Sequence, residues 1–164
     1  MATQSRHRLS EPVSARDHIR GPRSAVISLV EYGDFECPYC RAAEPIVAGL
    51  MEAVGDQLSV TFRHFPMLEV HPYGQHAAEV AEAAAAQGKF WEMHDMLFAN
   101  QNALDDASLV KYAVALGLDA ERVGRDWKVT NMRVASRKIA GVLWRAACAG
   151  RPASISTAHV TKAL

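Results

Sequence analysis

The sequence predicts an α/β fold, mainly from the pattern of its residues 25–65. The apolar run at residues 25–32 is rich in β-branched residues, which predicts a strand buried on both faces. Residues 41–54 then show helical periodicity, and residues 58–65 alternate well enough for a second strand. This β-α-β order implies two parallel strands joined by a right-handed crossover. Helical segments follow, so the sheet would need further strands near the end of the chain.

The first predicted helix has an apolar face that should pack on the sheet. Its members recur at helical spacing: Ile46, Val47, Leu50, Met51 and Val54. Gly55 is expected to end this helix, and Pro45 within it predicts a kink.

Three helices are predicted later, at residues 73–87, 90–100 and 108–116, and a further one starts near residue 119. The first of them is rich in alanine, and we expect its Glu79 and Glu82 to be exposed. The second carries aromatic and Met residues at helical spacing, which is typical of a packed core. Asp105 or Asp106 is expected to cap the third.

Composition excludes several classes of protein. With 164 residues, of which 49% are apolar, one domain can bury a core of its own. No apolar run approaches the length of a membrane span, and a net charge of zero argues against nucleic acid as the main partner. The first twenty residues are polar and lack the apolar centre of a secretory signal, so we expect a cytoplasmic protein.

The charge is unevenly distributed along the chain. Residues 1–126 hold 11 basic and 18 acidic side chains, whereas residues 127–164 hold 7 basic ones and no acid. This break and the predicted elements divide the chain into four parts. They are a flexible arm at 1–23 that stops at Gly21-Pro22, a β-α-β half at 24–66, a helical insertion at 67–126 and a basic tail at 127–164.

The chemistry is expected where the first strand meets the first helix. Cys37 stands at the position of an N-cap, Pro38 at the first helical position and Cys40 one turn further on. A helix N-terminus favours an anion and can lower a thiol pKa from about 8.5 into the range of about 3.5–7.5. Cys37 would then be the exposed attacking thiolate, and Cys40 would resolve a mixed disulfide with substrate.

Two further residues near the pair are candidates for the same reaction. Glu31 lies near the end of the buried strand, so burial should raise its pKa and let it take or return the Cys40 proton. Tyr39, between the cysteines, offers a flat surface for a substrate peptide.

Two other interpretations of the cysteines remain open. They could be two buried residues that never react, or ligands of a zinc ion together with Cys148 and a histidine. No second pair of ligands at zinc-like spacing appears, so we expect no metal and no bound cofactor. Four histidines are interpreted as surface or packing residues: His64, His71, His76 and His94.

These residues together resemble a known family. The stretch 30–40 (Val-Glu-Tyr-Gly-Asp-Phe-Glu-Cys-Pro-Tyr-Cys), the Phe-Arg-His-Phe-Pro sequence at 62–66 and the segment 88–95 resemble the DsbA-type thiol–disulfide oxidoreductases. The resemblance covers about residues 17–126. It implies a thioredoxin-like fold with an inserted α-helical domain, a buried acid at Glu31 and protein thiols or disulfides as substrates. It also implies a redox partner that recycles the pair. Some members are fused behind Na+/H+ antiporters.

The family pattern is expected to stop after Asp126. Members continue with a cis-proline loop that faces the first cysteine, and then with a β-hairpin. Here Pro152 follows Gly150-Arg151, and only residues 153–157 suggest a strand. With one allowed choice of codons for residues 149–163, a shifted reading frame would encode a family-like loop and hairpin, so a frameshift near Asp126–Trp127 is one hypothesis. The alternative is a divergent tail in which Pro152 still binds substrate. A missing hairpin would expose an edge of the sheet.

The sequence thus predicts a protein thiol–disulfide oxidoreductase, with Cys37, Cys40 and Glu31 as catalytic residues and Pro38, Tyr39 and Pro152 as substrate contacts. The second hypothesis is an impaired family member that is at most a thiol-bearing or metal-binding module. The direction of exchange depends on the reduction potential, which no motif reveals.

Overall fold

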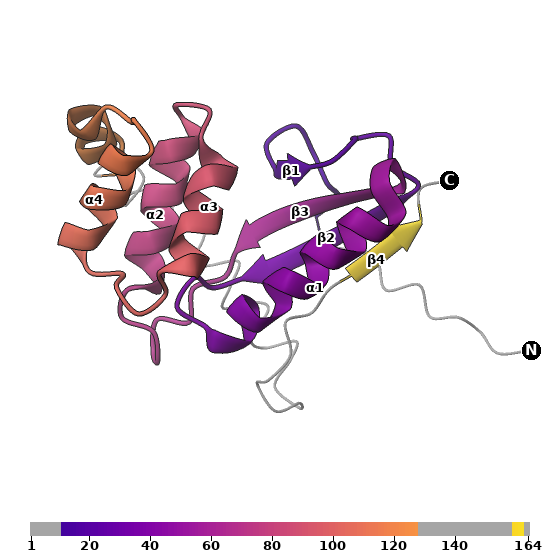
Figure 1. Ribbon diagram of the computed structural model, residues 1–164, viewed down its shortest axis with the longest axis horizontal. Helices are drawn as coiled ribbons and strands as arrows, with labels where there is room; N and C mark the ends of the chain where they lie inside the picture. Colours follow the sequence, from indigo (N-terminus) through magenta and orange to yellow (C-terminus); the bar gives the residue numbers. More distant parts are fainter. Residues whose placement is uncertain (1–10, 128–158, 163–164) are drawn as a thin grey trace, which may run out of the picture.

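The computed structural model describes residues 11–127 and 159–162. Within them a four-stranded sheet has the order β1-β3-β2-β4, with helix α1 packed across it and a group of helices beside one end (Figure 1). The strands are β1 (His18–Arg20), β2 (Ile27–Gly33), β3 (Leu58–His64) and β4 (His159–Lys162). The predicted α/β class is confirmed.

The β2-α1-β3 unit is the parallel pair that the sequence predicts. Strands β2 and β3 pair in parallel, with Glu31 opposite Phe62, and α1 (Pro38–Val54) connects them before a short 3₁₀ turn, η1 (Gly55–Gln57). Proline is tolerated at the first position of α1, and Pro45 lies within it. The unit places the N-terminus of α1 at the carboxyl end of β2.

Only part of the predicted apolar face of α1 is buried. Val47, Met51 and Val54 pack against a small cluster on the sheet, whereas Ile46 is 65% exposed and Leu50 is 47% exposed. The predicted apolar face was too wide. A sheet contacts only a narrow strip along a helix, and Ile46 and Leu50 lie outside that strip.

The predicted helical insertion is also present. It consists of α2 (Gly74–Ala85), α3 (Phe90–Ala99) and α4 (Asp106–Ala115), and residues 120–127 are helical as well. Asp105 caps α4, since its side chain accepts a hydrogen bond of 3.1 Å from the Ser108 N–H. The helices enclose a core that includes Met93, Leu97 and Phe98, as the sequence predicts.

Two acidic residues of α2 are not exposed, contrary to the sequence prediction. Glu79 is fully buried, and its carboxylate accepts hydrogen bonds from Gln75 Nε2 (2.7 Å) and Trp127 Nε1 (2.8 Å). Glu82 is partly buried beside two imidazoles, with its Oε1 2.9 Å from His18 Nε2 and 3.1 Å from His64 Nε2. Trp127, His18 and His64 come from other parts of the chain, so helical periodicity alone could not reveal them.

The boundary of the predicted arm needs correction. Residues 18–20 form β1, which pairs antiparallel with β3 and places Arg20 opposite Val60. Arg63 on β3 fixes the preceding segment, since its guanidinium donates to Asp17 Oδ1 (2.8 Å) and to the Glu11 carbonyl (2.9 Å). Strong side-chain anchoring therefore orders a segment whose composition suggested flexibility.

The far edge of β2 is paired, which corrects the expectation of an open edge. Strand β4 runs antiparallel to β2, with Val160 opposite Leu29. An unpaired row of backbone N–H and C=O groups favours the addition of such a strand. Pro152 and the expected strand at 153–157 lie outside the described residues. In the described part of the chain, no helix is long and apolar enough to cross a membrane.

Candidate active site

The two cysteines of the motif lie at the N-terminus of α1. Cys37 is the N-cap residue, with φ −76° and ψ 120°, and Pro38 opens the helix, as the sequence predicts. Cys40 lies 3.7 Å from Cys37, and both are free thiols. The backbone N–H groups of the first helical turn and the helix dipole favour negative charge at this position. The geometry suits a pair of thiols that can form a disulfide.

Both thiols are less accessible than expected. Cys37 is 6% exposed and Cys40 is 5% exposed, so the prediction of an exposed Cys37 is wrong in this structure. Both belong to the hydrophobic cluster that contains Phe35 and Phe62, which explains their burial. Tyr39 between them is 68% exposed and is the accessible side chain of the motif.

Asp34 organises the loop that leads into the motif. It is 3% exposed, and its carboxylate accepts hydrogen bonds from the N–H groups of Glu36 (2.9 Å) and Met67 (2.8 Å). The same carboxylate lies 2.7 Å from His71 Nδ1. Gly74 packs so closely that a Cβ atom there would lie 2.5 Å from Asp34 Oδ1. Asp34 therefore ties the β2–α1 loop to the segment that precedes α2.

Gln101 holds the same loop from the helical insertion. Its Nε2 donates a hydrogen bond of 2.8 Å to the carbonyl oxygen of Phe35 and another of 2.8 Å to that of Cys37. One side chain thus fixes the backbone on both sides of Glu36, directly before the reactive helix turn.

The environment of Cys40 keeps its proton on the thiol. Burial raises the pKa of Cys40 to about 12, the negative charges of Cys37 and Glu31 add to the rise, and the Asp34 N–H opposes it through a hydrogen bond of 3.5 Å to Cys40 Sγ. A thiol with such a pKa needs a base before it can attack another sulfur.

Glu31 is a buried acid whose charge acts on Cys40. It lies on β2, it is 3% exposed, and its Oε1 has no hydrogen-bond partner among the described residues. Burial raises the pKa of Glu31 to about 7, as the sequence analysis expected. A carboxyl group with this pKa exchanges its proton near neutral pH.

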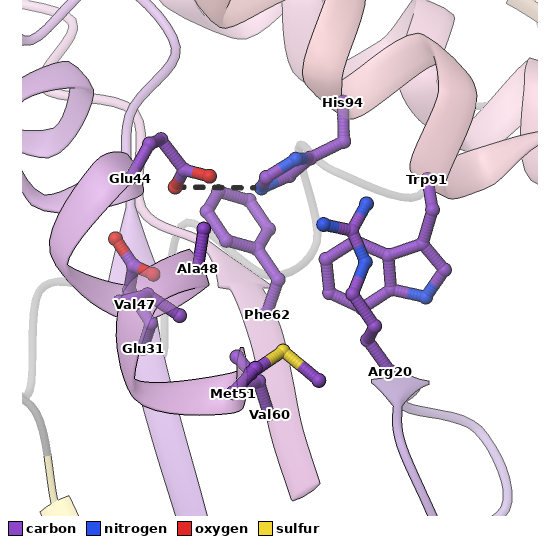
Figure 2. Close-up of a pocket in the computed structure, with 10 residues that line it drawn as sticks. All are labelled: Arg20, Glu31, Glu44, Val47, Ala48, Met51, Val60, Phe62, Trp91 and His94. Atoms are coloured by element: carbon purple, nitrogen blue, oxygen red, sulfur yellow. Dashed lines mark ion pairs between the residues drawn. The ribbon is translucent and has the colours of Figure 1, made fainter. Parts of the chain in front are cut away.

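A second, partly buried acid lines the same cavity as Glu31. Figure 2 shows Glu31, Glu44 of α1 and His94 of α3 around one small cavity, which Arg20 and Trp91 also line. Glu44 Oε1 lies 3.8 Å from His94 Nε2. Burial raises the pKa of Glu44 to about 7, with further contributions from the charges of Glu31 and Asp95 and an opposing one from Arg20. Glu44 was not among the candidate residues predicted from the sequence.

The four singled-out histidines all have acidic neighbours. His71 contacts Asp34, and His76 Nδ1 lies 2.7 Å from Asp106 Oδ1. His64 lies against Glu82, and His94 is 2% exposed within the core. His94 Nδ1 lies 2.9 Å from Asp95 Oδ1. None of these four contacts involves a cysteine, which agrees with their interpretation as packing or surface residues.

Two groups of side chains could hold a metal ion among the described residues. They are His18, His64 and Glu82, and Glu44, His94 and Asp95. The atoms of the first group already hydrogen-bond to one another, which explains their proximity without a metal. The two cysteines belong to neither group.

The parallel β-α-β unit, the helical insertion and a Cys-x-x-Cys pair at the first helix turn define a thioredoxin-fold protein. The chain belongs to the thioredoxin family, since a family model described as thioredoxin matches residues 14–147. The match reaches 21 residues past Asp126, where we expected the resemblance to stop, and residues 148–164, which include Pro152, lie beyond it.

Solved structures agree on the fold. A thioredoxin-like oxidoreductase from Silicibacter pomeroyi has a TM-score of 0.75 at 24% identity, over 92% of this chain and 83% of that one. The thiol-disulfide exchange protein alpha-DsbA2 from Wolbachia pipientis has a TM-score of 0.73 at 15% identity, over 87% and 75% of the two chains. The predicted resemblance to DsbA-type proteins is thereby confirmed for the fold.

Curated relatives are longer proteins. The chain is 57% identical over 109 residues to a Na+/H+ antiporter NhaA 3 from Salinispora tropica, covering 65% of this chain and 16% of that protein. It is 44% identical over 131 residues to a Na+/H+ antiporter NhaA 1 from Mycolicibacterium vanbaalenii, covering 79% and 21%. The chain therefore spans about a fifth or less of the length of these relatives.

Proposed function

We propose that this chain is a thiol–disulfide oxidoreductase that exchanges disulfides with protein thiols through Cys37 and Cys40. The observation that carries the proposal is the placement of Cys37 at a helix N-cap, 3.7 Å from Cys40, with buried Glu31 acting electrostatically on Cys40. If the two thiols were only packing residues, they would require neither a position at a helix N-terminus nor a buried acid such as Glu31 near them.

The proposed exchange has two steps, an attack by Cys37 on the substrate and an attack by Cys40 on the mixed disulfide. The Cys37 thiolate attacks one sulfur of a substrate disulfide, and the other substrate sulfur leaves as a thiolate. Cys40 Sγ then attacks Cys37 Sγ while its proton passes to Glu31, and the Cys37–substrate bond breaks with its electron pair on the substrate sulfur. The substrate disulfide is reduced and the Cys37–Cys40 pair is oxidised. The same steps in reverse oxidise a substrate dithiol.

The substrate contacts belong to the same proposal. The Tyr39 side chain is 68% exposed beside the two cysteines, so a substrate peptide could contact it. Pro38 lies in the same helix turn. Pro152 stays a proposed contact, since it lies outside the described residues. A cytoplasmic location and an unidentified recycling partner are likewise proposed. The longer relatives are named as Na+/H+ antiporters. We do not propose antiport for this chain, because it matches only 16% and 21% of those proteins.

Reduction of a protein disulfide by dithiothreitol tests the proposal, with insulin as substrate and its precipitation as the readout. We expect the chain to accelerate the reaction, Cys37→Ser to abolish the acceleration and Cys148→Ser to retain it. Equal rates with the wild-type chain and Cys37→Ser would contradict an enzymatic role. Zinc retained after dialysis would then favour the metal-binding module.

A further inference from the structure

Two histidines share one face of the sheet near the helical insertion. His18 is the first residue of β1 and lies opposite Phe62 of β3, and His64 is the last residue of β3. Because side chains alternate along a strand, Phe62 and His64 point to the same face of the sheet, and so does His18. The two imidazoles therefore lie diagonally across the β1–β3 pair, on the face where Glu82 of α2 meets them.

Glu82 brings both imidazoles to one carboxylate oxygen. Its Oε1 lies 2.9 Å from His18 Nε2 and 3.1 Å from His64 Nε2. The three atoms all lie within 4.8 Å of one another. These hydrogen bonds explain the cluster when no ion is bound, and they also hold two nitrogen atoms and one oxygen atom together in advance.

Aromatic side chains fix the orientation of both imidazoles. The ring of His18 stacks on Phe90, with 3.5 Å between the ring centroids and 9° between the planes. The ring of His64 meets Phe62 edge-on, with 5.5 Å between the centroids and 78° between the planes. Side chains that are already held in one rotamer lose little conformational entropy when they bind a ligand.

We propose that His18, His64 and Glu82 form a binding site for a Zn²⁺ ion that connects β1 and β3 of the sheet to α2 of the helical insertion. Two imidazole nitrogens and one carboxylate oxygen suit zinc, whereas Mg²⁺ and Ca²⁺ prefer oxygen ligands alone. Three protein ligands leave the fourth position of a tetrahedral site for a water molecule. The proposal goes beyond thiol–disulfide exchange, since none of the three ligands is a cysteine.

The distances in the cluster are close to those of a zinc site. Zinc bonds of about 2.0–2.1 Å in a tetrahedron place neighbouring ligand atoms roughly 3.3–3.4 Å apart. The separations of 2.9 and 3.1 Å at Glu82 Oε1 need to lengthen by only about 0.2–0.5 Å to match. The side chains of His18, His64 and Glu82 are 20%, 10% and 30% exposed, so an ion and a water molecule can reach them from solvent.

The charge of Glu82 is available to a cation. Within the described residues its carboxylate forms ion pairs with the two histidines and with no lysine or arginine. The other group of side chains that could hold a metal ion includes Asp95, and Arg20 donates hydrogen bonds of 2.8 Å to both oxygens of that carboxylate. A guanidinium in that position repels a second cation. The cluster at Glu82 is therefore the better site.

Zinc binding requires a change of tautomer at each imidazole. A carboxylate only accepts hydrogen bonds, so each Nε2 carries the proton that it donates to Glu82 Oε1. This proton must move to Nδ1 or to solvent before Nε2 can bind the ion. His64 Nδ1 is buried and has no hydrogen-bond partner among the described residues. A ligand histidine without such a partner binds about 10- to 100-fold more weakly, so we expect a site of moderate affinity.

Zinc titration of the full chain without thiols tests the site. Replacement of all three cysteines by serine, at Cys37, Cys40 and Cys148, removes the thiols as alternative ligands. We expect this chain to bind one Zn²⁺ in isothermal titration calorimetry. Co²⁺ in place of zinc should give the visible absorption of a four-coordinate complex without a sulfur-to-metal band.

Glu82→Gln in the same thiol-free chain removes the anionic ligand. Its dissociation constant for zinc should rise by at least about 100-fold, since even the loss of an outer contact costs about 10- to 100-fold. Glu52→Gln is the matched control, because Glu52 is exposed on α1, and it should bind zinc as the parent chain does. Zinc should also raise the melting temperature of the control and leave that of Glu82→Gln unchanged.

NMR of the wild-type chain supplies a readout that needs no variant. Nitrogen spectra of the imidazoles should show that added zinc moves the Nε2 signals of His18 and His64. The His76 side chain is 41% exposed and serves as the internal control, so its signals should stay in place.

Three results would each overturn the site. They are the absence of saturable zinc binding by the thiol-free chain below about 100 μM, equal dissociation constants for Glu82→Gln and Glu52→Gln, and unmoved His18 and His64 signals at the same zinc concentration. The insulin assay with Cys37→Ser uses other residues and another readout, so the zinc site and the proposed exchange activity can fail independently.

Discussion

Gln101 and Cys37 are joined by a hydrogen bond of 2.8 Å from the Gln101 side chain to the Cys37 carbonyl oxygen. The bond crosses from the helical insertion to the first turn of α1, and its partner bond to Phe35 fixes the loop on the other side. The insertion therefore contributes directly to the geometry of the thiol pair.

Replacing Gln101 tests that contribution. In Gln101→Leu both carbonyl groups lose their side-chain donor, although the Cys37 carbonyl keeps the Arg41 N–H at 3.2 Å. We therefore expect a loss of about 1–2 kcal/mol in the free energy of unfolding. The exchange rate should also fall by roughly three- to tenfold, because Cys37 is less well positioned. The neighbouring Asn102 is exposed, and Asn102→Ala should change neither quantity. Equal rates for the two variants would show that the loop keeps its geometry without Gln101.

Asp34 should be the more costly residue to lose. Asp34→Ala removes an acceptor from two backbone N–H groups and from His71, all in a buried loop. We expect a loss of about 3 kcal/mol in unfolding free energy, since buried donors without partners are expensive. Asp56→Ala, at an exposed aspartate, is the matched control. Denaturant unfolding of both variants measures the difference, and similar midpoints would contradict the role of Asp34.

Glu31 makes stability depend on pH in a defined direction. Its pKa is raised from 4.5 to about 7, so the folded state binds more protons than the unfolded state between these values. Its favourable contribution is complete below pH 4.5 and is lost as the pH rises through about 7. Glu31→Gln removes this dependence, so its stability relative to wild type should rise by roughly 3 kcal/mol from pH 4.5 to pH 9. A wild-type minus Glu31→Gln difference that is constant with pH would disprove the raised pKa.

Two glycines offer opposite tests of packing. A Cβ atom at Gly33, at the end of β2, would lie 2.3 Å from Phe62 Cε2, whereas one at Gly49 in α1 would meet nothing within 4 Å. We therefore expect Gly33→Ala to destabilise the fold by about 2 kcal/mol through overpacking. Gly49→Ala should stabilise it by up to about 1 kcal/mol, because alanine favours the helix. Thermal melts of the two variants that shift in the same direction would contradict the described packing.

The parts of the fold that were predicted correctly depend on local signals. The strands and the helix of the β-α-β unit follow from hydrophobic periodicity, and the starts of α1 and α4 follow from Pro38 and Asp105. Cys37, Cys40 and Glu31 could be proposed as site residues because motif spacing and strand position are also local. The same signals failed for β1, which has only three residues and depends on Arg63 of a distant strand.

Long-range contacts account for the residues that were missed. Glu79 and Glu82 match an exposed helix face in sequence, yet their partners Trp127, His18 and His64 lie 18 to 64 residues away. Gln101 is 64 residues from Cys37, and Glu44 lies beside His94 only because α3 packs near α1. The sequence shows only that Glu44 lies four residues after Cys40, which places both on the same face of the predicted helix.

The central claim is that Cys37 attacks and Cys40 resolves, and trapping the intermediate tests it most directly. In Cys40→Ser the resolving thiol is absent, so a disulfide-bonded protein substrate should remain covalently attached to Cys37. Non-reducing electrophoresis and mass spectrometry of the adduct measure this attachment, with Cys37→Ser as the comparison. The account predicts an adduct at Cys37 in Cys40→Ser that dithiothreitol releases, and none in Cys37→Ser. An adduct that forms equally in both variants, or only in Cys37→Ser, would contradict it.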